Sequence, residues 1–228
     1  MSQLILIRHG QSLWNLENKF TGWTDIELSD QGVKEAITAG KNLYQTGIDI
    51  DIAFSSVLKR ANDTLTYILK EMHKKNVPIH KSWRLNERHY GALQGLNKKE
   101  TMIKFGEEQV QTWRRSFDTL PPLLDENDPR NPKFDSLYRG IKNLPLGESL
   151  ESCQQRVLPY WYSDIYPELK KGNNVLIVAH GNSLRSLIMF LENLSKKEVL
   201  KLELPTGLPI IYNFDNQMHV ISKKIIES

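Results

Sequence analysis

The sequence has 228 residues, 39% of them hydrophobic, and a mean hydropathy of −0.46, which is typical of one water-soluble domain spanning 1–228. The formal net charge is only +3 and no dense run of Lys and Arg occurs, which argues against nucleic-acid binding. No apolar run is long enough to cross a membrane, and the single cysteine, Cys153, excludes an internal disulfide and favours a cytoplasmic location.

Apolar segments alternate with helical patterns along the first third of the chain. Leu4–Ile7 is an uninterrupted apolar run, which is typical of a strand buried on both faces of a parallel sheet. Ser29 is a candidate N-cap for a helix that reaches about Gln45. We expect a second strand at 50–54, a helix at 59–74 and a short edge strand at 78–80.

The middle of the chain is less regular. Residues 84–95 are polar and punctuated by glycine, which is typical of a functional loop. Asn97 to Glu100 has the pattern of a capping box that opens a helix, and 109–117 is a second helical piece. Residues 121–147 contain five of the ten prolines. We expect an insertion from about 87 to 147 that covers the active site without forming a separate domain.

The last third returns to alternating elements. We expect a long helix from about 150 to 161, a strand at 175–179, a helix at 183–194, a strand at 210–214 and a final strand near Val220. The pattern predicts an α/β fold with three layers, in which a mostly parallel sheet has helices on both faces.

Two of the predicted strands end in the same dipeptide. His9-Gly10 follows the first strand, and His180-Gly181 follows the strand at 175–179. A single histidine at a strand end is more often a hydrogen-bonded core residue than a catalyst. Ligands of open α/β sheets bind at the carboxyl ends of the strands, however, so the pair predicts two histidines facing one crevice.

A longer motif surrounds the first histidine. Arg8-His9-Gly10-Gln11-Ser12 with Trp14-Asn15 resembles the signature of the histidine phosphatase superfamily, and Phe20-Thr21-Gly22-Trp23 narrows the resemblance to cofactor-dependent phosphoglycerate mutases. The similarity runs from Leu4 to about Phe214. It implies a phosphoglycerate mutase-like fold and an isomerase that interconverts 3- and 2-phosphoglycerate through a phosphohistidine in glycolysis and gluconeogenesis. It also implies 2,3-bisphosphoglycerate as phosphoryl primer, no metal, and a possible homo-oligomer.

The residues and the resemblance together give a catalytic set. Neutral imidazole can attack phosphorus, so His9 is the candidate nucleophile, and the planar fork of Arg8 suits phosphate. The resemblance assigns Arg60 and His180 to the same phosphoryl group and makes Glu87 the general acid and base. The alternatives are that Arg60 is a solvated helix charge and that Glu87 forms an idle surface ion pair with Arg88, worth ~0–1 kcal/mol.

The resemblance also implies a set of substrate-binding residues for the carboxylate and phosphate of a phosphoglycerate. These residues are Ser12, Asn15, Thr21, Gly22, Arg88, His89, Tyr90, Lys98, Arg114, Arg115, Gly181 and Asn182. One residue departs from the family pattern, since Ala92 stands where glycine is usual.

Three alternatives to the mutase are a phosphatase, a metal site and a non-catalytic binder with the same fold, and the presence of both His9 and Glu87 argues against the binder. A phosphatase acting on small phosphomonoesters needs only the two histidines and a pair of arginines, whereas Lys98, Arg114 and Arg115 offer a second anion subsite and favour the mutase. His9, His180 and Glu87 are also a familiar metal set, but the arginines beside them would repel a divalent cation. We therefore expect small-molecule phosphoglycerates as partners, with neither nucleic acid nor membrane.

Overall fold

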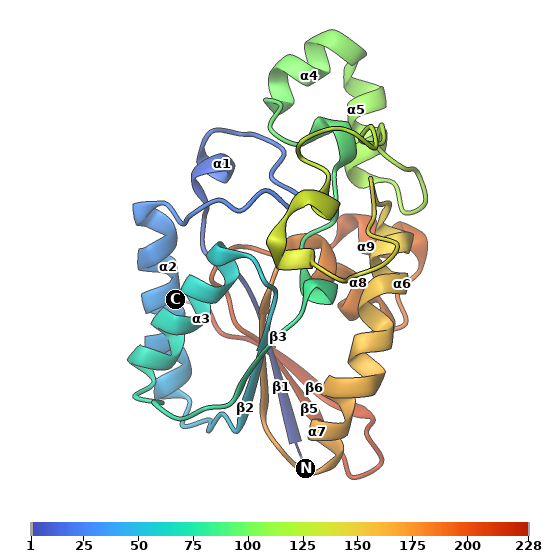
Figure 1. Cartoon of the computed structure of the whole chain (residues 1–228). Coiled ribbons are helices and arrows are strands. Elements are labelled where there is room, and N and C mark those ends of the chain that lie inside the picture. The colour runs from blue at the N-terminus through green and yellow to red at the C-terminus, as the bar shows by residue number, and fades with distance from the viewer. Residues whose placement is uncertain (1, 228) are drawn as a thin grey trace.

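The structure is a computed structural model that describes residues 2–227, and it is built on one six-stranded sheet (Figure 1). The order across the sheet is β3-β2-β4-β1-β5-β6, and the four strands from β3 to β1 are parallel to one another, whereas β5 pairs antiparallel with β1 and with β6. The mostly parallel sheet is therefore confirmed. The strands are β1 Ser2–Arg8, β2 Ile52–Ser55, β3 Ile79–Lys81, β4 Val175–Ala179, β5 Ile210–Phe214 and β6 Val220–Ile225.

Helices cover both faces of the sheet, as expected. In β1, Ile5 and Ile7 face the helices α2 (Asp30–Gln45) and α3 (Lys59–Glu71), whereas Leu4 and Leu6 face the opposite layer. That layer consists of α6 (Leu150–Tyr160), α7 (Tyr166–Lys170) and α8 (Gly181–Leu191), and α6 continues through a wider turn at Trp161–Ile165 into α7. Figure 1 shows the two helical layers on either side of the strands. Alternate side chains of each buried strand thus stabilise two separate cores.

The insertion lies beyond the carboxyl ends of the parallel strands (Figure 1). It contains α4 (Lys98–Phe105) and α5 (Glu107–Arg115), with short turns of 3₁₀ helix at Gly91–Leu93, Pro132–Phe134 and Ser136–Tyr138. Another 3₁₀ turn, Trp83–Leu85, lies just before the insertion. Asn97 caps α4 by accepting hydrogen bonds from the backbone N–H groups of Lys99 and Glu100. Two further short helices are α1 (Leu13–Leu16) and α9 (Lys196–Lys201).

Strand pairing places the two His-Gly corners together. Arg8 of β1 is in register with Ala179 of β4, and the backbone N–H of His9 donates to the carbonyl of Ala179 at 3.0 Å. The rings of His9 and His180 consequently lie with their centroids 4.9 Å apart. None of the helices in residues 2–227 combines the length and apolar character that a membrane span requires.

Candidate active site

A cavity of about 220 Å³ opens at the carboxyl ends of β1 and β4. Most of the residues predicted from the sequence line it, and the insertion supplies its outer wall. The predicted residues that line it are Arg8, His9, Asn15, Thr21, Gly22, Arg60, Glu87, Tyr90, Lys98, Arg114, Arg115, Gly181 and Asn182.

His9 is held as a neutral imidazole. Its Nδ1 lies 2.7 Å from the carbonyl oxygen of Gly10, which accepts only, so Nδ1 carries the proton and Nε2 is the unprotonated nitrogen. Burial, followed by the charges of Arg60 and Arg8, lowers the pKa of His9 well below its usual value. The nitrogen that faces Arg60 is therefore an unprotonated nucleophile at neutral pH.

Arg60 reaches His9 from the first turn of α3. Its Nε donates to His9 Nε2 at 3.3 Å, and its two Nη atoms donate to the carbonyls of Thr24 and Gly22 at 3.0 and 2.8 Å. The side chain is only 1% exposed, so the alternative of a solvated helix charge is wrong. Burial lowers the pKa of Arg60 to about 10, which leaves the guanidinium charged at neutral pH.

Arg8 has a hydrogen-bond donor that no protein group among the described residues uses. One Nη donates to the carbonyl of Leu204 at 2.8 Å, but the buried Nε finds no hydrogen-bond partner among the described residues. A buried donor without a partner costs free energy unless a ligand satisfies it. Arg8 is thus placed to bind an anion beside His9.

His180 occupies a different position from the one expected. It is fully buried and does not line the cavity, and its Nε2 lies 2.7 Å from the hydroxyl of Ser56. Burial, with the charges of Arg60 and other neighbours, lowers its pKa well below the usual value. His180 is therefore a neutral ring whose edge-on contact with His9 has a centroid distance of 4.9 Å, and its Nδ1 has no hydrogen-bond partner among the described residues.

Glu87 lies at the mouth of the same cavity. Its Oε1 accepts hydrogen bonds from the backbone N–H groups of Arg88, at 2.7 Å, and Asn182, at 3.1 Å. Glu87 and Arg88 are both buried, so the alternative of an idle surface ion pair is wrong. The carboxylate is held at the N-terminus of α8, where the helix dipole favours negative charge.

The insertion contributes further basic side chains to the lining of the cavity. Lys98 begins α4, and Arg114 and Arg115 end α5. Burial lowers the pKa of Lys98 and of Arg114. Both adjacent arginines line the cavity although their directions on a helix differ by about 100°, and Arg115 forms an ion pair with Glu203 at 3.0 Å.

Three residues predicted to bind substrate do not line the cavity. Ser12 is fully buried and caps α1 through reciprocal hydrogen bonds with Asn15. Arg88 lies with its guanidinium 4.6 Å from the ring centroid of Tyr90 and donates to the carbonyl of Arg114 at 3.0 Å. His89 is buried and accepts the backbone N–H of Gly91 on Nδ1. Each of these side chains contacts residues beside the cavity, but Nε and Nη1 of Arg88 and Nε2 of His89 have no hydrogen-bond partner among the described residues.

Three lining residues were missed by the sequence analysis: Lys19, Arg185 and Glu203. Arg185 lies one helical turn after Gly181 on α8, and its Nη1 donates to Asn182 Oδ1 at 3.0 Å. That spacing of three to four residues from the His-Gly corner was the available signal. The cavity thus has seven basic residues (Arg8, Lys19, Arg60, Lys98, Arg114, Arg115, Arg185) against two carboxylates (Glu87, Glu203).

Residues 121–147 do not contribute to the lining. Instead, Arg130 donates to the carbonyl of Gln94 at 2.7 Å, and the hydroxyl of buried Tyr138 accepts from the side chain of Asn86 at 2.9 Å. The cover over the cavity therefore comes from α4 and α5. The Ala92 departure has no strained backbone, since the positive φ of this turn, 57°, falls on Gly91.

The metal alternative has no geometric basis in residues 2–227, where no group of three or more His, Cys, Asp and Glu side chains is arranged to hold a metal ion. His9 and His180 each use one ring nitrogen on a neighbouring group of the protein.

Solved structures with the same fold extend over almost the whole chain. A mycobacterial glucosyl-3-phosphoglycerate phosphatase, solved with VO3, is 22% identical, with a TM-score of 0.74 and coverage of 99% of this chain and 97% of that one. A putative alpha-ribazole-5'-P phosphatase from Escherichia coli is 20% identical, with a TM-score of 0.73 and coverage of 100% and 96%. YhfR of Bacillus stearothermophilus is 24% identical, with a TM-score of 0.73 and coverage of 97% and 96%.

Identities at this level establish a shared fold. The family itself is shown by a separate comparison, in which the model of the histidine phosphatase superfamily (branch 1) matches residues 4–224. That range contains both His-Gly corners, Arg60, Glu87 and the whole insertion. The chain is a member of branch 1 of the histidine phosphatase superfamily.

Proposed function

We propose that this protein is a phosphoglycerate mutase that interconverts 3- and 2-phosphoglycerate through a phosphohistidine on His9, as part of glycolysis and gluconeogenesis. The observation that carries the proposal is the second group of basic residues, Lys98, Arg114 and Arg115, which the insertion adds to the cavity that His9 also lines. A substrate with one phosphate fills the site near His9, whereas a phosphoglycerate also brings a second anion to that group.

In the proposed reaction, His9 Nε2 forms a bond to phosphorus as the bond from phosphorus to the substrate oxygen breaks. Arg8 and Arg60 contact the phosphoryl oxygens and stabilise the charge that spreads over them in the transition state. The bond from Nδ1 to the carbonyl of Gly10 keeps the ring oriented and delocalises the positive charge that it gains. The cycle starts from phosphorylated His9: the free hydroxyl of 3-phosphoglycerate attacks the phosphorus as the bond from phosphorus to Nε2 breaks, which gives a bisphosphorylated glycerate and neutral His9. Nε2 then takes the phosphoryl group from the other oxygen, so 2-phosphoglycerate leaves and His9 is phosphorylated again.

Glu87 carries the proton in both directions. Glu87 lines the cavity, and the backbone N–H groups of Arg88 and Asn182 donate to its Oε1. Oε2 is therefore the oxygen that remains for the substrate. As a carboxylic acid it protonates the leaving oxygen, and as a carboxylate it removes the proton from the attacking hydroxyl.

The site also fits 2,3-bisphosphoglycerate. The unpartnered Nε of buried Arg8 and the excess of basic residues match a ligand with three anionic groups. Arg8 and Arg60 would hold one phosphate and Lys98, Arg114 and Arg115 the other. Such a ligand supplies the first phosphoryl group that His9 requires.

A second candidate is a histidine phosphatase acting on small phosphomonoesters. The structural neighbours named above include a glucosyl-3-phosphoglycerate phosphatase and a putative alpha-ribazole-5'-P phosphatase, which fits a phosphatase at least as well as a mutase. A phosphatase would use the same His9 intermediate and pass the phosphoryl group to water instead of to a second hydroxyl.

One experiment separates the two functions. The purified protein is incubated with 3-phosphoglycerate and catalytic 2,3-bisphosphoglycerate, and 2-phosphoglycerate and inorganic phosphate are measured in the same sample. The mutase proposal expects isomerisation to exceed phosphate release and to depend on the bisphosphoglycerate. Faster hydrolysis than isomerisation would establish the phosphatase instead.

A further inference from the structure

One charged pair lies behind the cavity, inside the protein, and has no part in the proposed chemistry. Arg156 of α6 forms a bidentate ion pair with Glu148, at 2.6 Å from Nε to Oε1 and 2.9 Å from Nη2 to Oε2. The two residues are 6% and 2% exposed, and neither lines the cavity. Burying two charges costs free energy that their attraction only partly returns, so such a pair is weak evidence of stability.

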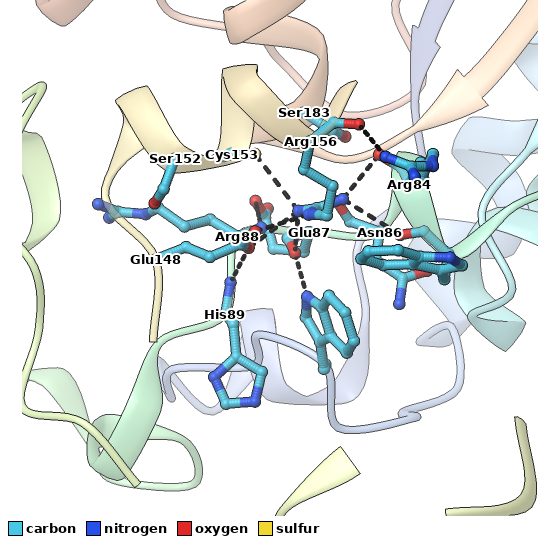
Figure 2. A network of polar contacts seen from close by, with 12 residues as sticks. Arg84, Asn86, Glu87, Arg88, His89, Glu148, Ser152, Cys153, Arg156 and Ser183 are labelled. Carbon is cyan, nitrogen blue, oxygen red and sulfur yellow. Dashed lines mark hydrogen bonds and ion pairs between the residues drawn. The ribbon is translucent and has the colours of Figure 1, made fainter. Parts of the chain in front are cut away.

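One further hydrogen bond of Arg156 runs from Nη2 to Cys153 Sγ at 3.4 Å, and the others go to the chain segment that leads to Glu87. Nη1 donates to the carbonyls of Trp83 and Arg84 at 3.1 and 2.7 Å, and Nη2 lies 3.2 Å from the carbonyls of Asn86 and Glu87. Figure 2 shows Arg156 with Glu148 on one side and Arg84 and Asn86 on the other. One side chain therefore fixes four carbonyls within five consecutive residues.

Glu148 holds the other end of the same segment. Its Oε2 accepts the backbone N–H of His89 at 2.8 Å, and its own backbone N–H donates to the carbonyl of His89 at 2.7 Å. Glu87 lies between the residues held by Arg156 and the residue held by Glu148. Its carbonyl also accepts the indole N–H of Trp23 at 2.6 Å.

We infer that Arg156 and Glu148 form a clamp that positions Glu87 for proton transfer in the proposed phosphoryl-transfer reaction, on which this inference rests. The clamp sets the backbone of residue 87 from α6, and α8 sets its carboxylate through the N–H of Asn182. Both helices pack in one layer against the sheet. Arg156 and Glu148 are thus positioning residues, since they act only through Glu87.

The test uses leaving groups that differ in their need for a proton. The rate of His9 phosphorylation is measured by rapid quench with 2,3-bisphosphoglycerate, whose alkoxide leaving group must be protonated, and with p-nitrophenyl phosphate, whose phenolate leaves without an acid. Arg156→Lys keeps the charge but cannot make the forked contacts. It should slow phosphorylation by 2,3-bisphosphoglycerate by roughly 10- to 100-fold, as a small misplacement does, and leave the rate with p-nitrophenyl phosphate nearly unchanged.

Three further variants make the test decisive. Glu87→Gln should show the same selectivity for leaving group, more strongly. Glu148→Gln combined with Arg156→Met has no buried charge, so it keeps the folded state accessible while removing the clamp. Leu169→Ala, in α7 of the same core, lowers thermal stability without touching the segment and should leave the ratio of the two rates unchanged.

The outcomes are distinguishable. If Glu87→Gln changes the ratio of rates but neither clamp variant does, the positioning role is wrong. If neither clamp variant folds while Leu169→Ala does, the pair is a folding element and the inference is overturned. If Glu87→Gln leaves the ratio unchanged, the proposed role of Glu87 fails first. Hydrolysis in place of isomerisation would refute the mutase alone, because both reactions need the acid.

Discussion

The two His-Gly corners share one sequence pattern and have different surroundings. After β1, His9 lines the cavity, with Nδ1 on the carbonyl of Gly10 and Nε2 on the guanidinium of Arg60. After β4, His180 is enclosed and bonds to Ser56. The partners come from other elements, since Arg60 belongs to α3 and Ser56 follows β2. The role of each histidine is therefore set by what packs against its strand end.

The glycines of the two corners differ as well. A Cβ added to Gly10 would lie 2.2 Å from the carbonyl oxygen of Gly32, so the backbone there approaches α2 too closely for any side chain. A Cβ on Gly181 would have its nearest neighbour, Arg8 Nε, at 3.6 Å. The first glycine is required by packing and the second is not.

The largest effect on kcat should come from replacing each of the two histidines by asparagine. His9→Asn removes the nucleophile and should lower kcat by at least about 10⁴-fold. His180→Asn removes only the ring that supports His9 and should lower kcat by roughly 10²-fold. Steady-state assays of the soluble, folded variants provide the measurement, and equal losses would show that the two corners have equivalent roles.

The second corner contributes to the reaction through Glu87, because the backbone N–H of Asn182 donates a hydrogen bond to the carboxylate of Glu87. Glu87→Gln keeps the shape and removes the titrating group, so kcat should fall by ~10²–10⁴-fold with little change in KM. Glu203→Gln is the matched control, since Glu203 lines the same cavity but pairs with Arg115. A normal kcat in Glu87→Gln would refute its role as proton carrier.

Replacing Gly10 and Gly181 by alanine should change the free energy of unfolding by different amounts. Gly10→Ala forces the chain away from α2 and should lower the free energy of unfolding by about 1–3 kcal/mol. Gly181→Ala should change it by no more than about 0.5 kcal/mol. Chemical denaturation of both variants tests the difference, and an undisturbed Gly10→Ala protein would contradict the close approach to Gly32.

Acid should destabilise the protein through its buried histidines. Burial, with the charges of Arg156 and Arg130, lowers the pKa of His89 to about 3 from a usual 6.5, and the pKa values of His9 and His180 are also lowered. Below pH 6.5 the unfolded chain binds protons that the folded one does not, so stability falls as the pH falls.

His89 allows this dependence to be measured without changing the lining of the cavity. Each such histidine contributes a slope of about 1.4 kcal/mol per pH unit. His89→Asn keeps an acceptor for the N–H of Gly91 and removes the titration, so its unfolding free energy should depend less steeply on pH over this acidic range. Denaturant titrations of the variant and the parent protein provide the comparison, and identical slopes would show that His89 is not buried as a neutral ring.

The sequence allowed the layers and strand ends to be predicted, because long apolar runs and caps such as Ser29 depend on local physics. The adjacency of His9 and His180 followed from the rule that parallel strands end at one edge of a sheet. The motif could not show which of its members face the cavity. Ser12, Arg88 and His89 have the residue types of ligand contacts, but none of the three side chains lines the cavity.

Other parts of the site had no local signal at all. Arg185, Lys19 and Glu203 are ordinary surface charges when considered along the chain, and the fold alone gathers them. Arg156 and Glu148 likewise have the sequence context of any amphipathic helix and its N-terminus. Their burial depends on the segment before Glu87, which lies about 70 residues before Arg156 in the sequence and contacts it only in the folded chain.

The central claim is that the first corner, and only that corner, carries the phosphoryl group. The protein is mixed with 2,3-bisphosphoglycerate, quenched in alkali to preserve phosphohistidine, digested and mapped by mass spectrometry. The account predicts an acid-labile phosphoryl group on the peptide containing His9, which is absent in His9→Asn and present in His180→Asn. A group that maps to His180, or turnover without any phosphohistidine, would contradict it.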